Sequence, residues 1–201
     1  MTINRFEMPT VVATLVVVSI GLVAGAGLTA RAQPDSPWGP KWTAKDELIL
    51  PQGYHRWIFL GSPLTPNALN DGAANFPEYH NVYVHPEALK VFKKTGEWPE
   101  GTILLKELQL TFLGENPDGS RDEPSGRGYF PGARNGIDIS VKDSKRFKDT
   151  NNWGFFNFGH HAPPYAKTAT VQPSEACAGC HIGNATNMVF SKFYAPILNT
   201  K

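Results

Sequence analysis

The chain has 201 residues, enough for one domain and a targeting segment, and its net charge is +1. Hydrophobic residues make up 41% and charged residues 18%, which excludes a disordered polypeptide. Residues 1–32 carry two basic residues and one acidic residue, so the remainder has 17 of each and lacks a basic run. This balance excludes a charged surface for nucleic acid or anionic lipid and favours a small or neutral partner.

The N-terminal segment has the pattern of a secretory signal peptide. Arg5 precedes an uncharged, mostly apolar run over residues 11–30, and Ala30-Arg31-Ala32 forms a small-x-small cleavage pattern. We therefore expect a signal peptide over residues 1–32, cleaved after Ala32, and a periplasmic protein with a single domain over residues 33–201. An uncleaved anchor is the alternative, because the apolar run is just long enough to span a bilayer.

The rest of the chain predicts short strands and short helices. Thr43 and Asp46 resemble a capping box and predict a short helix near residues 44–50. Pro86 at a first helical position and Gly96 at an end predict a second helix between them. The predicted strands cover residues 56–61, 80–85, 102–112, 137–141 and 153–158.

Two further segments complete the prediction. Residues 114–136 hold six glycines and three prolines and predict a long loop. The segment from Ser174 to the C-terminus predicts a helix around the two cysteines, with Ser174 as its N-cap. No internal repeat is visible. The order of elements predicts an α+β fold with a mainly antiparallel sheet and a few short helices.

The segment Cys177-Ala178-Gly179-Cys180-His181 has the C-x-x-C-H pattern of c-type haem attachment. Two thiols add to the vinyl groups along one porphyrin edge, and the histidine that follows ligates the iron. Zinc would need about four ligands, whereas both cysteines of the chain lie in this motif. A thioredoxin-like pair would not need the histidine, and a disulfide across so short a loop would stabilise little. We therefore expect one haem c on Cys177 and Cys180, with its iron ligated by His181.

The sixth position of that iron has few candidate ligands. Met188 is the one methionine after the signal segment, and a helix that continued from His181 would place both on the same face. The remaining histidines are more often surface or hydrogen-bonded residues than ligands, with the His160-His161 pair the one to watch; they are His55, His80, His85, His160 and His161. We therefore expect an open site, which favours small-molecule binding or catalysis over electron transfer alone.

The longest predicted strand contains a lysine in an apolar row. Period-2 alternation places Leu104, Lys106 and Leu108 on one face and Glu107 and Gln109 on the other. Burial of a charged ammonium is costly, so we expect Lys106 to be neutral, paired or chemically used. A snorkelling or edge-strand lysine is the alternative. Beside a haem, a neutral buried amine would be a nucleophile towards the macrocycle.

Asp138 is a second candidate. It alternates with Ile137 and Ile139, so the pattern alone places it on a solvent face. A carboxylate near a haem pocket could instead move protons.

An ordered series of motifs resembles the cytochrome P-460 family, whose sister group is the beta-type cytochromes c′. The series covers most of the chain after residue 32. Its stretches are L-P-x-G-Y-H-R-W-I-F-L-G from Leu50, T-P-N-A-L-N-D-G from Thr65, N-V-Y-V-H-P-E-A from Asn81, F-K-K-T-G-E-W-P-E-G-T-I-L-L-K-E-L from Phe92, S-V-K-D-S-K-R-F from Ser140, and C-A-G-C-H followed by M-V-F-S-K-F-Y.

The resemblance implies a mainly antiparallel β fold, a homodimer, and a five-coordinate haem whose axial histidine is here His181. It implies that Lys106 matches the lysine bonded to a meso carbon of the porphyrin, which separates cytochrome P-460 from the beta-type cytochromes c′. It also implies oxidation of hydroxylamine, with nitric oxide chemistry and nitrous oxide or nitrite as the product.

The resemblance further implies roles for three residues. Asp138 falls where relatives place a distal carboxylate that relays protons, although theirs is a glutamate. Phe76 falls where they place a distal phenylalanine, and His80 falls where they have an arginine.

Together with these patterns, the resemblance implies an exported haem enzyme that oxidises hydroxylamine and passes electrons singly to a periplasmic acceptor such as a cytochrome c. In this prediction Lys106 tunes the macrocycle, Asp138 takes protons and Phe76 shapes the pocket. One alternative is a non-catalytic nitric-oxide-binding protein of the beta-type cytochrome c′ kind. The other is an electron-transfer monohaem cytochrome c whose iron is closed.

Overall fold

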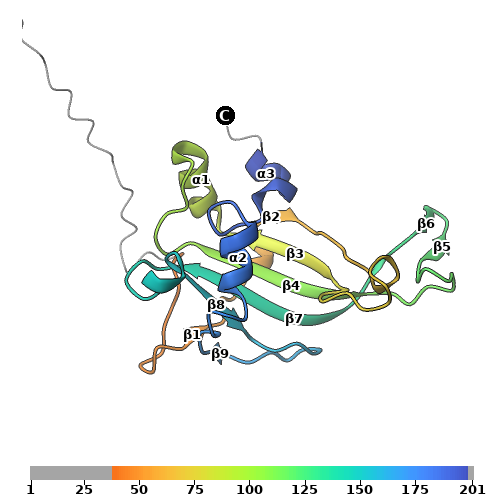
Figure 1. Cartoon of the computed structure of the whole chain (residues 1–201), viewed down its shortest axis with the longest axis horizontal. Coiled ribbons are helices and arrows are strands. Elements are labelled where there is room, and N and C mark those ends of the chain that lie inside the picture. The colour runs from red at the N-terminus through yellow and green to blue at the C-terminus, as the bar shows by residue number, and fades with distance from the viewer. Residues whose placement is uncertain (1–37, 199–201) are drawn as a thin grey trace, which may run out of the picture.

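A five-stranded antiparallel sheet forms the centre of the molecule (Figure 1). The computed structural model describes residues 38–198. The strand order is β2-β3-β4-β7-β8, and every neighbouring pair is antiparallel. The strands are β2 (Ile58–Gly61), β3 (Tyr79–Val84), β4 (Ile103–Thr111), β7 (Pro131–Lys142) and β8 (Trp153–Asn157). With three short helices beside this sheet, the predicted α+β class is confirmed.

The helices are short and lie between or after the strands. They are α1 (Pro86–Thr95), α2 (Ala178–Asn184) and α3 (Ala195–Leu198), with 3-10 turns η1 (Tyr54–Arg56), η2 (Asn67–Leu69), η3 (Lys148–Thr150) and η4 (Ser191–Phe193). The prediction for α1 is confirmed: Pro86 is its first residue, and Gly96 closes it with a φ of 77°. Between residues 38 and 198, no helix combines the length and apolarity needed to cross a membrane.

The predicted loop over residues 114–136 is wrong in part. It contains a small hairpin of β5 (Arg121–Glu123) and β6 (Gly126–Gly128), which projects beyond the end of the main sheet (Figure 1). Arg127 steadies the hairpin through Ser120 Oγ at 2.7 Å and Asp118 Oδ2 at 2.9 Å. Composition could not reveal this hairpin. Its many glycines and prolines favour a loop, and only the side-chain hydrogen bonds within the segment offset that preference.

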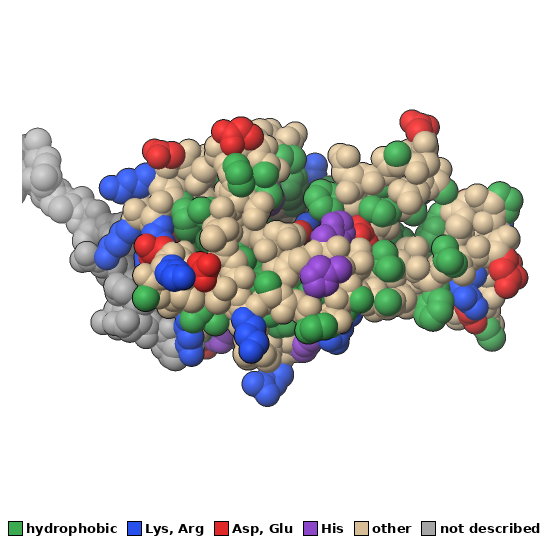
Figure 2. Space-filling model, turned by 90° about the horizontal axis from the view of Figure 1, so that it is seen from below, with side chains coloured by type: hydrophobic (Ala, Val, Ile, Leu, Met, Phe, Trp, Pro, Cys, Tyr) green, Lys and Arg blue, Asp and Glu red, His purple; other side chains and the backbone are tan. Residues whose placement is uncertain are grey.

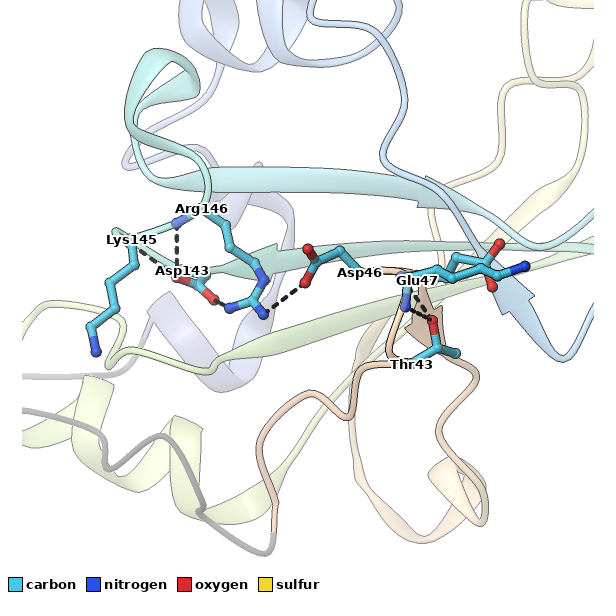
Figure 3. Close-up of polar contacts among 7 residues, drawn as sticks. Thr43, Asp46, Glu47, Asp143, Lys145 and Arg146 are labelled. Atoms are coloured by element: carbon cyan, nitrogen blue, oxygen red, sulfur yellow. Dashed lines mark hydrogen bonds and ion pairs between the residues drawn. The ribbon is translucent and has the colours of Figure 1, made fainter.

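The predicted helix near residues 44–50 is also wrong. Thr43 Oγ1 accepts hydrogen bonds from the backbone N–H groups of Lys45 and Glu47, and these close a turn in place of a helix (Figure 3). The chain then pairs as β1 (Leu48–Ile49) with β9 (Thr168–Ala169). The capping residue therefore does form local bonds, but pairing with a distant segment decides the conformation that follows.

The turn before β1 is tied to the segment after β7. Arg146 lies between two carboxylates, 3.2 Å from Asp143 and 3.1 Å from Asp46 (Figure 3). Its guanidinium also lies over the Trp42 ring, 4.6 Å from the ring centroid. These contacts hold the N-terminal part of the described chain against the sheet.

The sheet is buried on both faces. One face packs against the helices through Leu104, Phe155 and their neighbours, and Phe92 of α1, Ala178 of α2 and Ile197 of α3 belong to the same cluster. The other face forms a second core, made of Leu48, Tyr54, Ile103, Leu105, Ile137, Ile139, Val141, Phe156, Phe158 and Ala169. In Figure 1 the β1–β9 pair lies below the sheet, while α1 and α3 lie above it.

Strand β4 alternates as predicted, but only one of its faces had been expected to face the core. Leu104 belongs to the helix-side cluster, and Leu105 is fully buried in the cluster on the other side. Glu107 is buried as well. When a strand is buried on both faces, its hydrophobic pattern alone does not indicate which face lines a functional site.

Candidate functional site

One cavity of about 530 Å³ brings together the side chains that the sequence singled out. It opens on the helix-side face of the sheet, between β3, β4, β7 and β8 and the segment that carries α2. All seven predicted site residues line it: Phe76, His80, Lys106, Asp138, Cys177, Cys180 and His181. A second hollow, of about 440 Å³ around Lys142 and Asn151, contains none of these seven.

His181 is held in a defined orientation by its surroundings. Its Nδ1 lies 2.8 Å from the backbone oxygen of Met188, and its ring packs between Phe155 and Phe190. A carbonyl can only accept, so Nδ1 carries the proton and the Nε2 lone pair is left for a metal. Burial lowers the pKa of His181 despite the Met188 bond, and the nearby Lys106 charge lowers it further. Both effects favour the neutral imidazole that ligation requires.

The helix around the motif begins later than predicted. Cys177 is the N-cap of α2, so the prediction of Ser174 as the N-cap is wrong. The backbone oxygen of Ser174 instead accepts from the N–H of Gly179, the second residue of α2. Helix α2 ends at Asn184, so Met188 is not on the same helix as His181. It nevertheless lies behind His181, because its carbonyl holds the imidazole.

The two thiols of the motif differ in exposure. Cys177 is half-buried and packs against the helix-side core, while Cys180 is exposed. Burial raises the pKa of Cys177, and the Asp138 carboxylate raises it further, so the group is a thiol and not a thiolate. Both sulfurs and the His181 ring line the same apolar cavity, which is the arrangement that haem attachment requires.

Lys106 and Asp138 face each other across neighbouring strands. They are register partners in the β4–β7 ladder, and Lys106 Nζ lies 3.0 Å from Asp138 Oδ2. Their side chains are 26% and 27% exposed, so neither is sealed in the core. Asn157 Nδ2 donates to Asp138 Oδ1 at 2.7 Å. The solvent face that pattern alone gave Asp138 is thus the wall of the cavity.

An aromatic and an imidazole ring lie beside the Lys106 amine. Lys106 Nζ is 4.4 Å from the centroid of the Phe76 ring, which meets His80 edge-on at 5.8 Å. Burial and the Lys106 charge lower the pKa of His80 to about 4. Its Nε2 atom is buried and has no hydrogen-bond partner, so a neutral imidazole with an unused polar atom borders the cavity.

The sequence did not identify three further polar residues at this site. Glu78 is buried and lies 2.6 Å from His160, which lines the cavity. Asn135 and Asn157 hold the carboxylates of Glu78 and Asp138 respectively. No motif marks these residues, because 82 positions separate Glu78 from His160 and the sheet alone brings them together.

The cavity suits a metal that arrives within an organic ring. Between residues 38 and 198, no group of three or more His, Cys, Asp or Glu side chains could hold a bare metal ion. Of the three histidines that line the cavity, His181 alone lies in the same motif as the two thiols. A porphyrin supplies the other iron ligands itself, so one histidine and two thiols are sufficient.

Comparison with known proteins supports the same conclusion. No curated protein matches the chain. The family model of cytochrome P460 matches residues 51–191, a span that includes the sheet, the Lys106–Asp138 pair and the C-x-x-C-H motif. The family implies a c-type haem and suggests a protein of the hydroxylamine-oxidising type. Since the match extends over more than half of its length, the chain belongs to the cytochrome P460 family.

Proposed function

We propose that this chain is an exported c-type haem enzyme that oxidises hydroxylamine, with nitric oxide chemistry, to nitrous oxide, nitrite or both. The observation that carries the proposal is the position of the Lys106 amine, which lines the same cavity as Cys177, Cys180 and His181. An amine becomes a nucleophile once it has lost its proton. Asp138, 3.0 Å away, is the acceptor beside it.

The chain's own residues would hold the haem. Cys177 and Cys180 would form the two thioether bonds, and His181 Nε2 would ligate the iron. Lys106 Nζ would form an additional bond to the macrocycle and so change its electronic properties. When bound, the haem iron would accept electrons from the substrate one at a time.

Hydroxylamine oxidation releases protons that the protein must accept. Two hydroxylamine molecules that form one nitrous oxide and one water release four electrons and four protons, and one that forms nitrite with one water releases four electrons and five protons. Asp138 would accept protons in the cavity, with Asn157 orienting its carboxylate at 2.7 Å. Phe76 would limit the space for the ligand. His80 Nε2, which lacks a hydrogen-bond partner, would form a hydrogen bond to the ligand.

The remaining parts of the proposal rest on sequence. The segment that predicts export and cleavage after Ala32 lies outside the described residues. We expect the purified protein to begin at Gln33, and its intact mass tests this. A periplasmic cytochrome c would take the electrons, and the protein would be a homodimer, which its mass in solution would reveal.

Steady-state turnover tests the proposed reaction. Purified protein should oxidise hydroxylamine with a one-electron acceptor, and Lys106→Leu should reduce turnover to background while keeping its haem. Lys145→Leu is the matched control, because Lys145 is exposed and does not line the cavity. Parental turnover in Lys106→Leu would contradict the role of the lysine.

Asp138→Ala tests the proton acceptor separately. We expect turnover to fall by about 100-fold, the lower end for loss of a general base, with haem content unchanged. An unchanged rate would remove Asp138 from the mechanism.

The ion pair itself favours a second candidate function. A Lys106 amine that keeps its proton and stays paired with Asp138 is not a nucleophile, and the protein would then be a nitric-oxide-binding member of the beta-type cytochrome c′ kind. That candidate predicts an ordinary haem c spectrum after reduction. The cross-linked haem predicts a red-shifted one.

An electron carrier with a closed iron is less well supported. The Met188 sulfur lies 3.8 Å from Asn151 Nδ2, and the Met188 carbonyl binds His181 from behind. An electron carrier predicts a low-spin ferric spectrum that does not respond to cyanide or nitric oxide, so adding either ligand tests it.

A further inference from the structure

A buried glutamate and a partly exposed histidine form a pair at the edge of the cavity. Glu78 Oε1 lies 2.6 Å from His160 Nε2 and accepts a second hydrogen bond from Asn135 Nδ2 at 2.8 Å. The Glu78 side chain is 3% exposed, and that of His160 is 43% exposed. Histidine side chains reach the surface in the middle of the face shown in Figure 2. His160 therefore contacts a buried carboxylate, the cavity and solvent.

The pairing determines which nitrogen of His160 can take a proton. Burial raises the pKa of Glu78, but the bonds from His160 and Asn135 outweigh burial and lower it, so Glu78 is a carboxylate. A carboxylate only accepts, so the neutral His160 ring donates its Nε2 proton to Glu78. Its Nδ1 is then a free acceptor. A buried carboxylate orients a catalytic histidine in the same way in serine hydrolases.

Few charged groups other than Glu78 lie near the His160 ring. Glu78 Oε2 is buried without a partner, so the negative charge of the carboxylate lies beside the imidazole ring without a second hydrogen bond. Lys106 and Asp138, the other charged groups on the cavity wall, are already paired with each other. His80 is neutral, and the Phe76 ring stacks against His160 at 6.5 Å.

We propose that His160, oriented by Glu78, carries protons from the cavity to solvent. Each proton released by a ligand in the cavity passes to His160 Nδ1, and the resulting imidazolium, stabilised by Glu78, passes it to bulk water. No electron moves in this step, and the Nε2–H bond to Glu78 is kept throughout. The relay deepens the proposed function, because hydroxylamine oxidation releases protons that must leave.

Ligand binding to the ferric haem protein tests the relay without turnover. Hydrogen cyanide must lose a proton as it binds, whereas nitric oxide has none to lose. In His160→Gln we expect the association rate of hydrogen cyanide to fall about tenfold or more, because an amide cannot shuttle a proton. The association rate of nitric oxide should stay within about twofold, since that ligand needs no proton relay.

His161→Gln is the matched control. His161 is the neighbouring histidine, it is exposed, and it does not line the cavity. Both ligands should bind this variant at parental rates. If the two rates fall together in His160→Gln, the residue merely shapes the cavity and the relay is overturned.

Glu78→Gln tests the orienting carboxylate. The amide matches glutamate in size, so the fold and haem content should persist, which the thermal midpoint and the visible spectrum check. Without the carboxylate an imidazolium is less favoured, so the decline of the cyanide rate towards low pH should move to lower pH. An unchanged pH profile would overturn the role of Glu78.

These outcomes are separable from the proposed function. If hydroxylamine is not turned over but His160→Gln slows cyanide alone, the relay stands and the proposed reaction fails. If turnover is normal and His160→Gln binds cyanide at the parental rate, the reaction stands and the relay fails.

Discussion

The two faces of the central sheet each carry a charged cluster, and the two clusters meet at neighbouring residues of β4. Lys106 faces the cavity, where it and Asp138 each keep about a quarter of their side chain exposed, at 26% and 27%. Glu107 faces the opposite core and is 5% exposed. It accepts from the Tyr54 hydroxyl at 2.6 Å and lies 3.3 Å from Arg134.

This difference in exposure distinguishes Glu107, a charge that stabilises the fold, from the Lys106–Asp138 pair, whose charges a ligand can reach. Glu107 has three partners, the third being His55 at 3.4 Å, and its side chain is almost completely buried. The Lys106–Asp138 pair borders about 530 Å³ of open space, so a ligand or cofactor can approach it. We therefore expect changes at Glu107 to reduce stability, and changes at Lys106 to alter chemistry with little effect on the fold.

Removal of both thiols should have the largest effect of all the changes considered, because it should abolish haem attachment on the cavity face of the sheet. It should leave the core on the opposite face almost unchanged. When it is made in the Lys106→Leu background, the double variant Cys177→Ser, Cys180→Ser has none of the three groups proposed to bond to the porphyrin, so covalent haem should be lost completely. Haem staining of a denaturing gel measures this. Haem that stays attached in the double variant would disprove the assignment of the motif.

A pair of stability measurements tests the comparison directly. Glu107→Leu removes the acceptor of Tyr54 and Arg134 and should cost about 2–4 kcal/mol of unfolding free energy. When both variants are compared in protein produced without haem, where no cross-link exists, Lys106→Leu breaks only a partly exposed ion pair and should cost about 1 kcal/mol or less. Urea unfolding measures both. Equal losses would mean that the two faces are not functionally distinct.

Local signals explain what could be predicted of the fold. Pro86 and Gly96 marked α1 because each acts on its own backbone, and period-2 alternation located the long strands. The β1–β9 pair was missed because it joins residues far apart in the sequence. The prediction of a helix near residues 44–50 failed for the same reason.

The site residues also divide into those with a local sequence signal and those brought together only by the fold. The C-x-x-C-H motif is contiguous, and Lys106 stood out as a charge in an apolar row, so both could be found from sequence. Glu78 carries no such signal, and His160 stood out only as a member of a histidine pair, because only the folded sheet makes the two residues neighbours.

A smaller effect should appear in the pH dependence of stability. Folding lowers the pKa of His80 from 6.5 to about 4, so the stabilising contribution of the neutral ring is present above 6.5 and is lost as pH falls towards 4. His80→Asn removes this titration. The drop in thermal midpoint between about pH 7 and about pH 4.5 should shrink by about 2–4 °C, with His161→Asn as control. An identical drop in parent and variant would show that His80 is not the titrating group.

The mass of the haem-bearing peptide is the most direct test of the central claim, that the Lys106 amine is bonded to a haem held by Cys177 and Cys180. Digestion of the purified protein with trypsin should release the haem on a branched peptide that contains both the Cys177–Cys180 segment and the segment around Lys106. A haem peptide that carries the cysteine segment alone, with Lys106 recovered as an unmodified residue, would contradict the account.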